Sequence, residues 1–186
     1  MDNERNRVCP VEYANSLDSR IRKWLQNPKK ILTPYVQEGM TVLDIGCGPG
    51  FFSIEMAKMV GKTGKVISAD LQEGMLQKLS NKIKGTELQE RLTLVKCGKD
   101  TTNVTDRVDF ILAFYMVHEV PEKMSFFREL KNILNEKGQF LLIEPKLFHV
   151  SEEEFKSTVA VAEMVGFKLY QGPKLPFSWS AVLKNA

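Results

Sequence analysis

The chain has 186 residues, of which 43% are hydrophobic, and its formal net charge is +3. This length supports one well-buried domain and is short for two. The longest uninterrupted apolar run, residues 110–117, is far shorter than the roughly 20 residues of a membrane-spanning helix. Residues 1–20 carry charges where a secretory signal needs an apolar stretch, so we expect a cytoplasmic protein without membrane insertion.

The cysteines and the charge distribution exclude further classes of protein. Cys9, Cys47 and Cys97 are odd in number and lack paired spacing, which argues against a disulfide framework or a structural zinc site, and no metal is expected. The excess positive charge lies in residues 1–30, with seven Lys or Arg and four Asp or Glu. These basic residues are not interleaved with aromatic ones, so no nucleic-acid partner is expected.

Short apolar segments alternate with longer amphipathic ones along most of the chain. Residues 1–38 favour one or two helices, broken at Asn27–Pro28. The apolar segments predict strands that are buried on both faces, as in a parallel sheet: residues 41–45, 65–70, 92–97, 109–117 and 139–145. The intervening patterns predict helices that end near Gly61, Gly85 and Gly138.

The last part of the chain predicts one helix and two strands. Ser151 and Glu154 match a capping box, which favours a helix over 151–165 that stops at Gly166. The remaining residues predict an antiparallel hairpin. We therefore expect an α/β fold, with a doubly wound, Rossmann-like, mostly parallel seven-stranded sheet. The single domain divides into a helical lid (1–38), a cofactor-binding core (39–145) and a C-terminal helix and hairpin (146–186).

The stretch VLDIGCGPGFF contains the most informative pattern. Gly46, Gly48 and Gly50 fall where the first strand turns into the first helix, which is the ligand edge of a doubly wound sheet. A phosphate-binding P-loop ending at Gly61-Lys62-Thr63 would need glycine at position 56, where Met stands. A dinucleotide motif would need glycine at position 51, where Phe stands. The pattern therefore favours a ligand without phosphate.

Two acids narrow the ligand further. Asp44, near the end of the first strand, would repel a pyrophosphate and attract an ammonium or sulfonium group. Asp70 ends the second strand, where a carboxylate can accept hydrogen bonds from both hydroxyls of a ribose. A ribose with a cationic tail describes S-adenosylmethionine.

At these residues the chain resembles the class I S-adenosylmethionine-dependent methyltransferases, whose first motif is a strand, an acid and G-x-G-x-G. The resemblance covers roughly residues 39–145, including the segment from Phe114 to Pro145, and is closest to the small-molecule methyltransferases of ubiquinone and menaquinone biosynthesis. It implies that Asp44 balances the methionine end of the cofactor and that Asp70 holds the ribose. The other cofactor-binding residues that it implies are Gly46, Cys47, Gly48, Gly50, Leu71, Asp100 and Phe114.

Several residues at the predicted ligand edge could act as a general base. His118 and Glu119 follow the fourth strand, Glu144 ends the fifth, and Tyr13 belongs to the N-terminal segment. A base is needed only when the acceptor keeps a proton, as an alcohol, phenol or carbon acid does. His118, Glu144 and Tyr13 are the predicted catalytic residues, with Tyr13 and Trp24 of the lid facing the substrate.

The sequence supports one leading function and leaves others open. We expect in-line methyl transfer from S-adenosylmethionine to a small, hydrophobic or partly aromatic molecule. The alternatives are a non-catalytic module that binds S-adenosylmethionine or S-adenosylhomocysteine, a protein methyltransferase, a metalloid methyltransferase that uses Cys9 and Cys97, and a nicotinamide dehydrogenase. The methyl acceptor and the oligomeric state stay open.

Overall fold

A computed structural model describes residues 26–146 and 150–185. Its strands form a seven-stranded sheet in the order β3-β2-β1-β4-β5-β7-β6. The strands are β1 (Thr41–Ile45), β2 (Lys65–Asp70), β3 (Leu92–Lys96), β4 (Val108–Phe114), β5 (Leu134–Pro145), β6 (Phe167–Gln171) and β7 (Ser178–Asn185). β1 to β5 pair in parallel, whereas β7 is antiparallel to both β5 and β6. The predicted fold class is confirmed.

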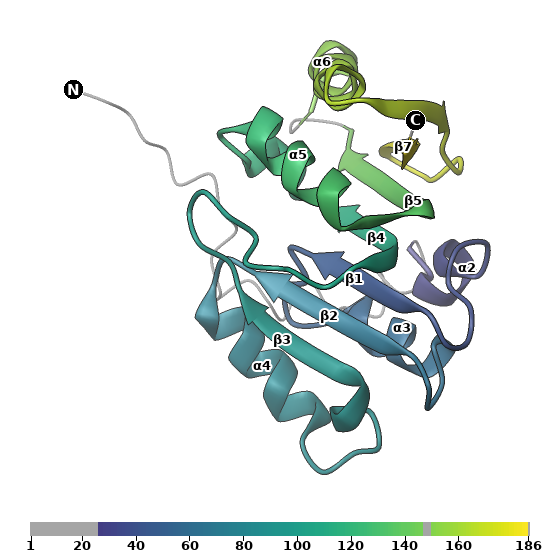
Figure 1. The fold of residues 1–186 in the computed structure, drawn as a ribbon, viewed down its shortest axis with the longest axis vertical. Coiled ribbons are helices and arrows are strands. Elements are labelled where there is room, and N and C mark those ends of the chain that lie inside the picture. Colours follow the sequence, from purple (N-terminus) through teal and green to yellow (C-terminus); the bar gives the residue numbers. More distant parts are fainter. Residues whose placement is uncertain (1–25, 147–149, 186) are drawn as a thin grey trace.

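Helices cover both faces of this sheet. The α-helices are α2 (Pro28–Leu32), α3 (Ser53–Met59), α4 (Glu73–Ile83), α5 (Lys123–Ile133) and α6 (Glu152–Met164), and short 3-10 turns are η2 (Gln89–Arg91) and η3 (Val117–Glu119). In Figure 1, α4 lies beside β3 at one end of the sheet and α6 lies at the other end. No helix within the described ranges is long and apolar enough to cross a membrane.

The central strands are apolar at successive positions because each face of the sheet has its own core. In β1, Val42 packs into the core that includes residues of α2, α3 and α4, whereas Leu43 packs into the core that includes residues of α5 and α6. Both side chains are fully buried. Two helical layers therefore explain why the strand does not alternate between apolar and polar residues.

The fourth strand and the helix after it are both shorter than the sequence predicts. β4 ends at Phe114 instead of residue 117, because Tyr115 has a positive φ of 59° that turns the chain. α5 ends at Ile133, well before Gly138, which lies inside β5. Leu134 is fully buried and pairs with Val108 of β4, so tertiary pairing extends the fifth strand toward its N-terminus.

The ends of two other helices form as the sequence predicts. The Asn27 side chain accepts a hydrogen bond from the Lys30 N–H at the start of α2. At α6, Ser151 and Glu154 form the reciprocal capping box. Of the predicted lid, residues 1–25 lie outside the described part of the chain, and so do Tyr13 and Trp24.

Candidate functional site

A cavity of about 530 Å³ lies at the carboxyl ends of the parallel strands. It adjoins β1, which pairs with β2 on one side and with β4 on the other, so the order of the strands along the sheet reverses at β1. Ligands of doubly wound sheets bind at this kind of switch point. Most of its lining comes from the loop after β1, the end of β2, the loop after β3 and the turn between β4 and α5, and Gln26 and residues of α5 add to it.

The three positions after β1 are glycine for different physical reasons. All have positive φ angles, of 72° at Gly46, 53° at Gly48 and 87° at Gly50. A Cβ at Gly46 would lie 2.7 Å from Met116, and one at Gly50 would lie 2.3 Å from Leu79 of α4. A Cβ at Gly48 would meet nothing within 4 Å. Gly46 and Gly50 therefore allow close packing, whereas Gly48 presents bare backbone to the cavity.

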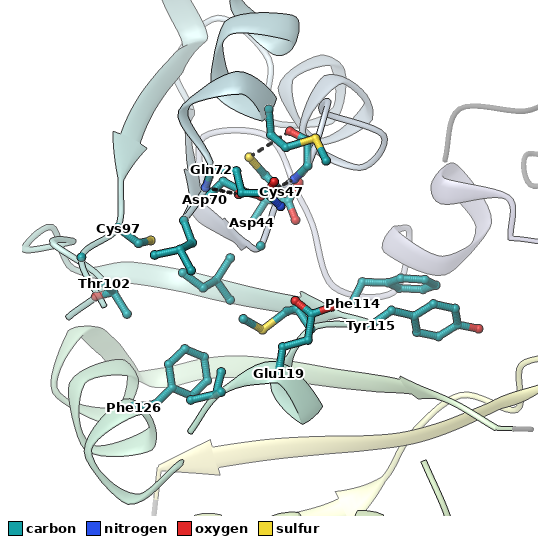
Figure 2. Close-up of a pocket in the computed structure, with 18 of the residues that line it drawn as sticks. Asp44, Cys47, Asp70, Gln72, Cys97, Thr102, Phe114, Tyr115, Glu119 and Phe126 are labelled. Atoms are coloured by element: carbon teal, nitrogen blue, oxygen red, sulfur yellow. Dashed lines mark hydrogen bonds between the residues drawn. The ribbon is translucent and has the colours of Figure 1, made fainter. Parts of the chain in front are cut away.

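Asp70 joins the glycine loop to the end of β2 (Figure 2). Its carboxylate accepts hydrogen bonds from the N–H groups of Gly48 at 2.8 Å and Gln72 at 2.7 Å. Burial raises the pKa of this acid, and the two N–H donors and Lys96 oppose that rise. Each carboxylate oxygen keeps a further acceptor position, so Asp70 is oriented to receive two more donors from the cavity.

Asp44 supplies a second buried acid on the same side of the cavity (Figure 2). The side chain is 2% exposed, and one of its oxygens accepts a 2.5 Å hydrogen bond from the hydroxyl of Ser53 at the start of α3. Asp44 also lines the cavity. A carboxylate in this poorly solvated position favours a ligand that carries positive charge.

The cavity also contains two thiols, Cys47 and Cys97. Burial, followed by the charges of Asp44 and Asp70, raises the pKa of Cys47 well above its usual value. Burial and the charge of Asp70 raise the pKa of Cys97 to about 11, against an opposing effect of Lys96. Without a nearby cation, both thiols are therefore protonated near neutral pH. Cys9 lies outside the described residues. Within residues 26–146 and 150–185 there is no cluster of three metal-ligating side chains.

The loop after β3 is fixed to α5 by a carboxylate. Glu129 accepts hydrogen bonds from the N–H of Thr102 at 2.8 Å and from its hydroxyl at 2.9 Å. Asp100 belongs to this loop and lines the cavity, as does the partly exposed Leu71 after β2. Glu129 thus positions the segment that carries Asp100.

Tyr115 begins the turn after β4 and depends on partners from distant parts of the chain. Its N–H donates to the carbonyl of Ile143 in β5 at 2.8 Å. Its hydroxyl lies 2.6 Å from the Ser178 hydroxyl and accepts a 2.9 Å hydrogen bond from Gln26. Tyr115 packs against Phe114, with ring centroids 4.2 Å apart, and both rings line the cavity.

His118 and Glu144 form a pair behind this turn. Glu144 is 1% exposed and accepts hydrogen bonds from the Val117 N–H at 2.7 Å and the His118 N–H at 3.3 Å. The His118 Nδ1 atom lies 2.5 Å from the other Glu144 oxygen. Burial lowers the pKa of His118, but the hydrogen bond and charge of Glu144, together with Glu119, outweigh it and raise the pKa overall.

The structure brings together most of the residues that the sequence predicts for the cofactor. Those that line the cavity are Asp44, Gly46, Cys47, Gly48, Asp70, Leu71, Asp100 and Phe114. Gly50, His118 and Glu144 are not among the lining residues, whereas Glu119 is. Tyr115 and Glu129 were not identified from the sequence. Tyr115 belongs to an uninterrupted apolar run and Glu129 to an amphipathic helical pattern, and neither pattern marks a functional residue.

The lining residues fit S-adenosylmethionine. The open space beside Gly48 admits a ligand against the backbone, Asp70 can accept two ribose hydroxyls, and Asp44 favours a cationic group. Asp100 and Leu71 line the same cavity. These features need no phosphate-binding group.

Comparison with known proteins agrees with this geometry. Residues 36–180 match the family described as a methyltransferase domain. A solved S-adenosylmethionine-dependent methyltransferase from Aquifex aeolicus is 27% identical, with a TM-score of 0.84 over 95% of this chain and 98% of that one. The chain belongs to the class I S-adenosylmethionine-dependent methyltransferases. The predicted family and cofactor are confirmed.

Several similar proteins of known name act in quinone biosynthesis according to those names. A demethylmenaquinone methyltransferase of Bacillus subtilis is 24% identical over 85% of this chain and 68% of its own length. A ubiquinone/menaquinone biosynthesis C-methyltransferase of Escherichia fergusonii is 30% identical over 59% of this chain and 44% of its own length. For most of these relatives, the matched region spans about half of their length.

A more distant structure supports the fold alone. A TehB-like S-adenosylmethionine-dependent methyltransferase of Corynebacterium glutamicum is 15% identical, with a TM-score of 0.73 over 95% of this chain and 100% of that one. Its identity is too low to carry residue roles to this methyltransferase.

Proposed function

We propose that this protein transfers the methyl group of S-adenosylmethionine to a small, uncharged and partly aromatic molecule. The observation that carries this proposal is the cavity in which Asp70 is oriented by two backbone N–H groups beside the open face of Gly48. When bound, S-adenosylmethionine supplies an activated methyl group on a sulfonium. The protein then has to align the acceptor and exclude water, which can supply most of the rate enhancement.

The cavity walls indicate the chemistry of the acceptor. Among the described residues that line it, the acids are Asp44, Asp70, Asp100, Glu119, Glu122 and Glu129, and the basic residue is Lys99. This excess of carboxylates disfavours an anionic acceptor such as a phosphate ester or a carboxylate. Phe114, Tyr115 and Phe126 add aromatic surface, which suits an aromatic ring.

The named relatives suggest a specific acceptor to test first. Enzymes named for demethylmenaquinone methylation share this domain, so we propose a quinol-type ring as the acceptor class. A quinol keeps protons near neutral pH, and its methylation calls for a group that receives one. Neither His118 nor Glu144 lines the cavity, so a direct role for either as a base requires the turn to move.

The N-terminal segment remains part of this proposal. Gln26, the first described residue, lines the cavity and donates a hydrogen bond to Tyr115. Because Gln26 lies at the cavity wall, it supports the proposal that the segment before it, which includes Tyr13, covers the acceptor. A cytoplasmic location without a nucleic-acid partner also belongs to the proposal, supported by the odd number of cysteines and the balanced charge beyond residue 30.

Calorimetry with S-adenosylhomocysteine tests the cofactor site directly. We expect micromolar binding by the full chain and a loss of about 100-fold in Asp70→Ala, because two hydrogen bonds to a charged acceptor disappear. Asp106→Ala is the control, since this exposed acid pairs with Lys65 away from the cavity. Absence of binding by the wild type would refute the proposal. Binding without methyl transfer to a short-chain demethylmenaquinol or any other small molecule of a cell extract would favour the non-catalytic alternative.

A further inference from the structure

Glu119 occupies the opposite side of the cavity from Asp44 and Asp70. It comes from η3, the 3-10 turn after β4, and Figure 2 shows its side chain directed from this turn toward the glycine loop. The side chain is 21% exposed, so water screens its charge only in part. Glu119 therefore places a carboxylate on the side of the cavity that the glycine motif does not reach.

Residues outside the cavity hold Glu119 in this position. The His118 Nε2 atom lies 3.9 Å from a Glu119 oxygen, and the Nδ1 atom of the same ring lies 2.5 Å from Glu144. Glu144 also accepts hydrogen bonds from the backbone N–H groups of Val117 and His118. One buried carboxylate thus orients the histidine and fixes the turn from which Glu119 projects, so Glu144 and His118 are positioning residues.

The two forms of the cofactor differ at a single charged group. S-adenosylmethionine has a positive sulfonium, whereas S-adenosylhomocysteine has a neutral thioether. When the acceptor bonds to the methyl carbon, the carbon–sulfur bond breaks and its electron pair stays on sulfur. Adenine, ribose and the amino-acid end are the same in both, so Asp70 cannot distinguish the substrate from the product. A carboxylate directed at the sulfur can.

We propose that Glu119 faces the sulfonium and makes the cavity favour S-adenosylmethionine over S-adenosylhomocysteine. The inference rests on the proposed function, because it assumes that the cofactor occupies this cavity. The attraction of Glu119 for the bound cofactor ends when the methyl group leaves, so the same carboxylate that favours binding of the donor favours release of the product.

Binding measurements with a small set of variants test this inference without an acceptor. The ligands are S-adenosylmethionine, S-adenosylhomocysteine and sinefungin, a stable analogue with an amine in place of the sulfonium. In Glu119→Gln we expect Kd to rise about tenfold for both charged ligands, because the variant lacks the negative charge, whose attraction water screens in part at this partly exposed position. Kd for S-adenosylhomocysteine should change less than about twofold. Glu119→Asp, which keeps the charge, should retain most of the preference.

Two control variants separate this effect from other causes. Glu163→Gln removes an exposed acid of α6 that does not line the cavity, so the ratio of the two Kd values should stay constant. Asp70→Asn should raise the Kd values of all three ligands equally, because each ligand contains the ribose.

The outcomes distinguish the inference from the proposed function. If no ligand binds to the wild type, both fail. If all three bind and Glu119→Gln leaves the ratio of Kd values unchanged, or weakens the neutral ligand as much as the charged ones, the role of Glu119 is refuted and the cofactor site stands. Weaker binding of the charged ligands alone supports the role of Glu119.

Discussion

The cavity has two walls, and they are built from different sources. The first, which we call the glycine-loop wall, comprises residues 44–52 and 70–72, and a hydrogen bond from the Gly48 N–H to Asp70 links the loop after β1 to the end of β2. The second, the turn wall, comprises residues 114–122 and relies on side chains of β5 and β7, namely Glu144 and Ser178. The first wall can therefore be recognised from a sequence motif, whereas the second depends on residues far apart in the chain.

The buried acid behind the turn wall should give the largest effect on stability. Glu144→Ala leaves the buried N–H of Val117 without its acceptor and removes the partner of His118. We expect the free energy of unfolding to fall by about 2–4 kcal/mol, as for other broken buried polar networks. Urea denaturation measures this. Glu144→Gln keeps one acceptor oxygen and should lose less.

The matched control for that experiment is Glu163→Ala, which truncates an exposed acid of α6. Its effect should stay within about 0.5 kcal/mol. If both alanine variants were equally stable, the turn wall would not depend on Glu144.

Substitution of two glycines of the first wall should lower stability to different extents. In Gly50→Ala the new methyl meets Leu79 at 2.3 Å with a φ of 87°, so we expect a loss of about 2–3 kcal/mol of stability. In Gly48→Ala the methyl meets nothing, and only about 1 kcal/mol from the positive φ should be lost. Urea denaturation measures the stability of each variant, and calorimetry with S-adenosylhomocysteine measures its affinity for the ligand.

Ligand affinity completes this contrast between packing and binding. The methyl of Gly48→Ala enters the space assigned to the cofactor, so we expect a larger loss of affinity in this variant than in Gly50→Ala wherever both remain folded. Equal affinities would show that Gly48 does not contact the ligand.

The smallest effect concerns the dependence of stability on pH. His118 has a raised pKa, so the folded protein binds its proton more tightly than the unfolded chain does. This stabilisation is fully present below the unfolded pKa of about 6.5 and is lost as the pH rises through the higher folded pKa. Burial lowers the pKa of His118 and Lys123 does too, but Glu144 and Glu119 favour the charged ring and outweigh both.

Thermal denaturation of the wild type and His118→Gln checks this sign. The wild type should lose stability relative to the variant as the pH rises above about 6.5. A difference between the two proteins that is independent of pH would mean that His118 acts only by packing.

The prediction of the fold succeeded where apolar runs and turn residues agree. β1 and β2 have the predicted bounds because each apolar run is closed by a loop that contains glycine or an acid. β4 was predicted too long because residues 110–117 are all apolar, and only the contacts of Tyr115 with Ile143 and Ser178 show where the strand stops. α5 was predicted too long because Leu134 suits a helix face as well as a strand, and its pairing with Val108 decides between them.

The prediction of the site divides along the same line. The residues assigned to the cofactor follow from a motif whose spacing reflects a tight turn and two acids at strand ends, and all except Gly50 line the cavity. The assignment of residues to proton transfer was based on the ability of His and Glu side chains to bind protons. Side chains that pair for structural reasons have the same ability. Sequence reasoning therefore could not distinguish His118 and Glu144, which face each other, from Glu119, which faces the cavity.

The sequence by itself determined the sheet, the family and the cofactor, because strand periodicity and the glycine motif are local properties that neighbouring residues specify. Only the tertiary structure decided the direction of the side chains on the turn wall. The buried carboxylate of Glu144 needs nearby donors, and the fold supplies them from the turn after β4. The chain satisfies that requirement by directing His118 inward, and Glu119, the next residue, lines the cavity instead.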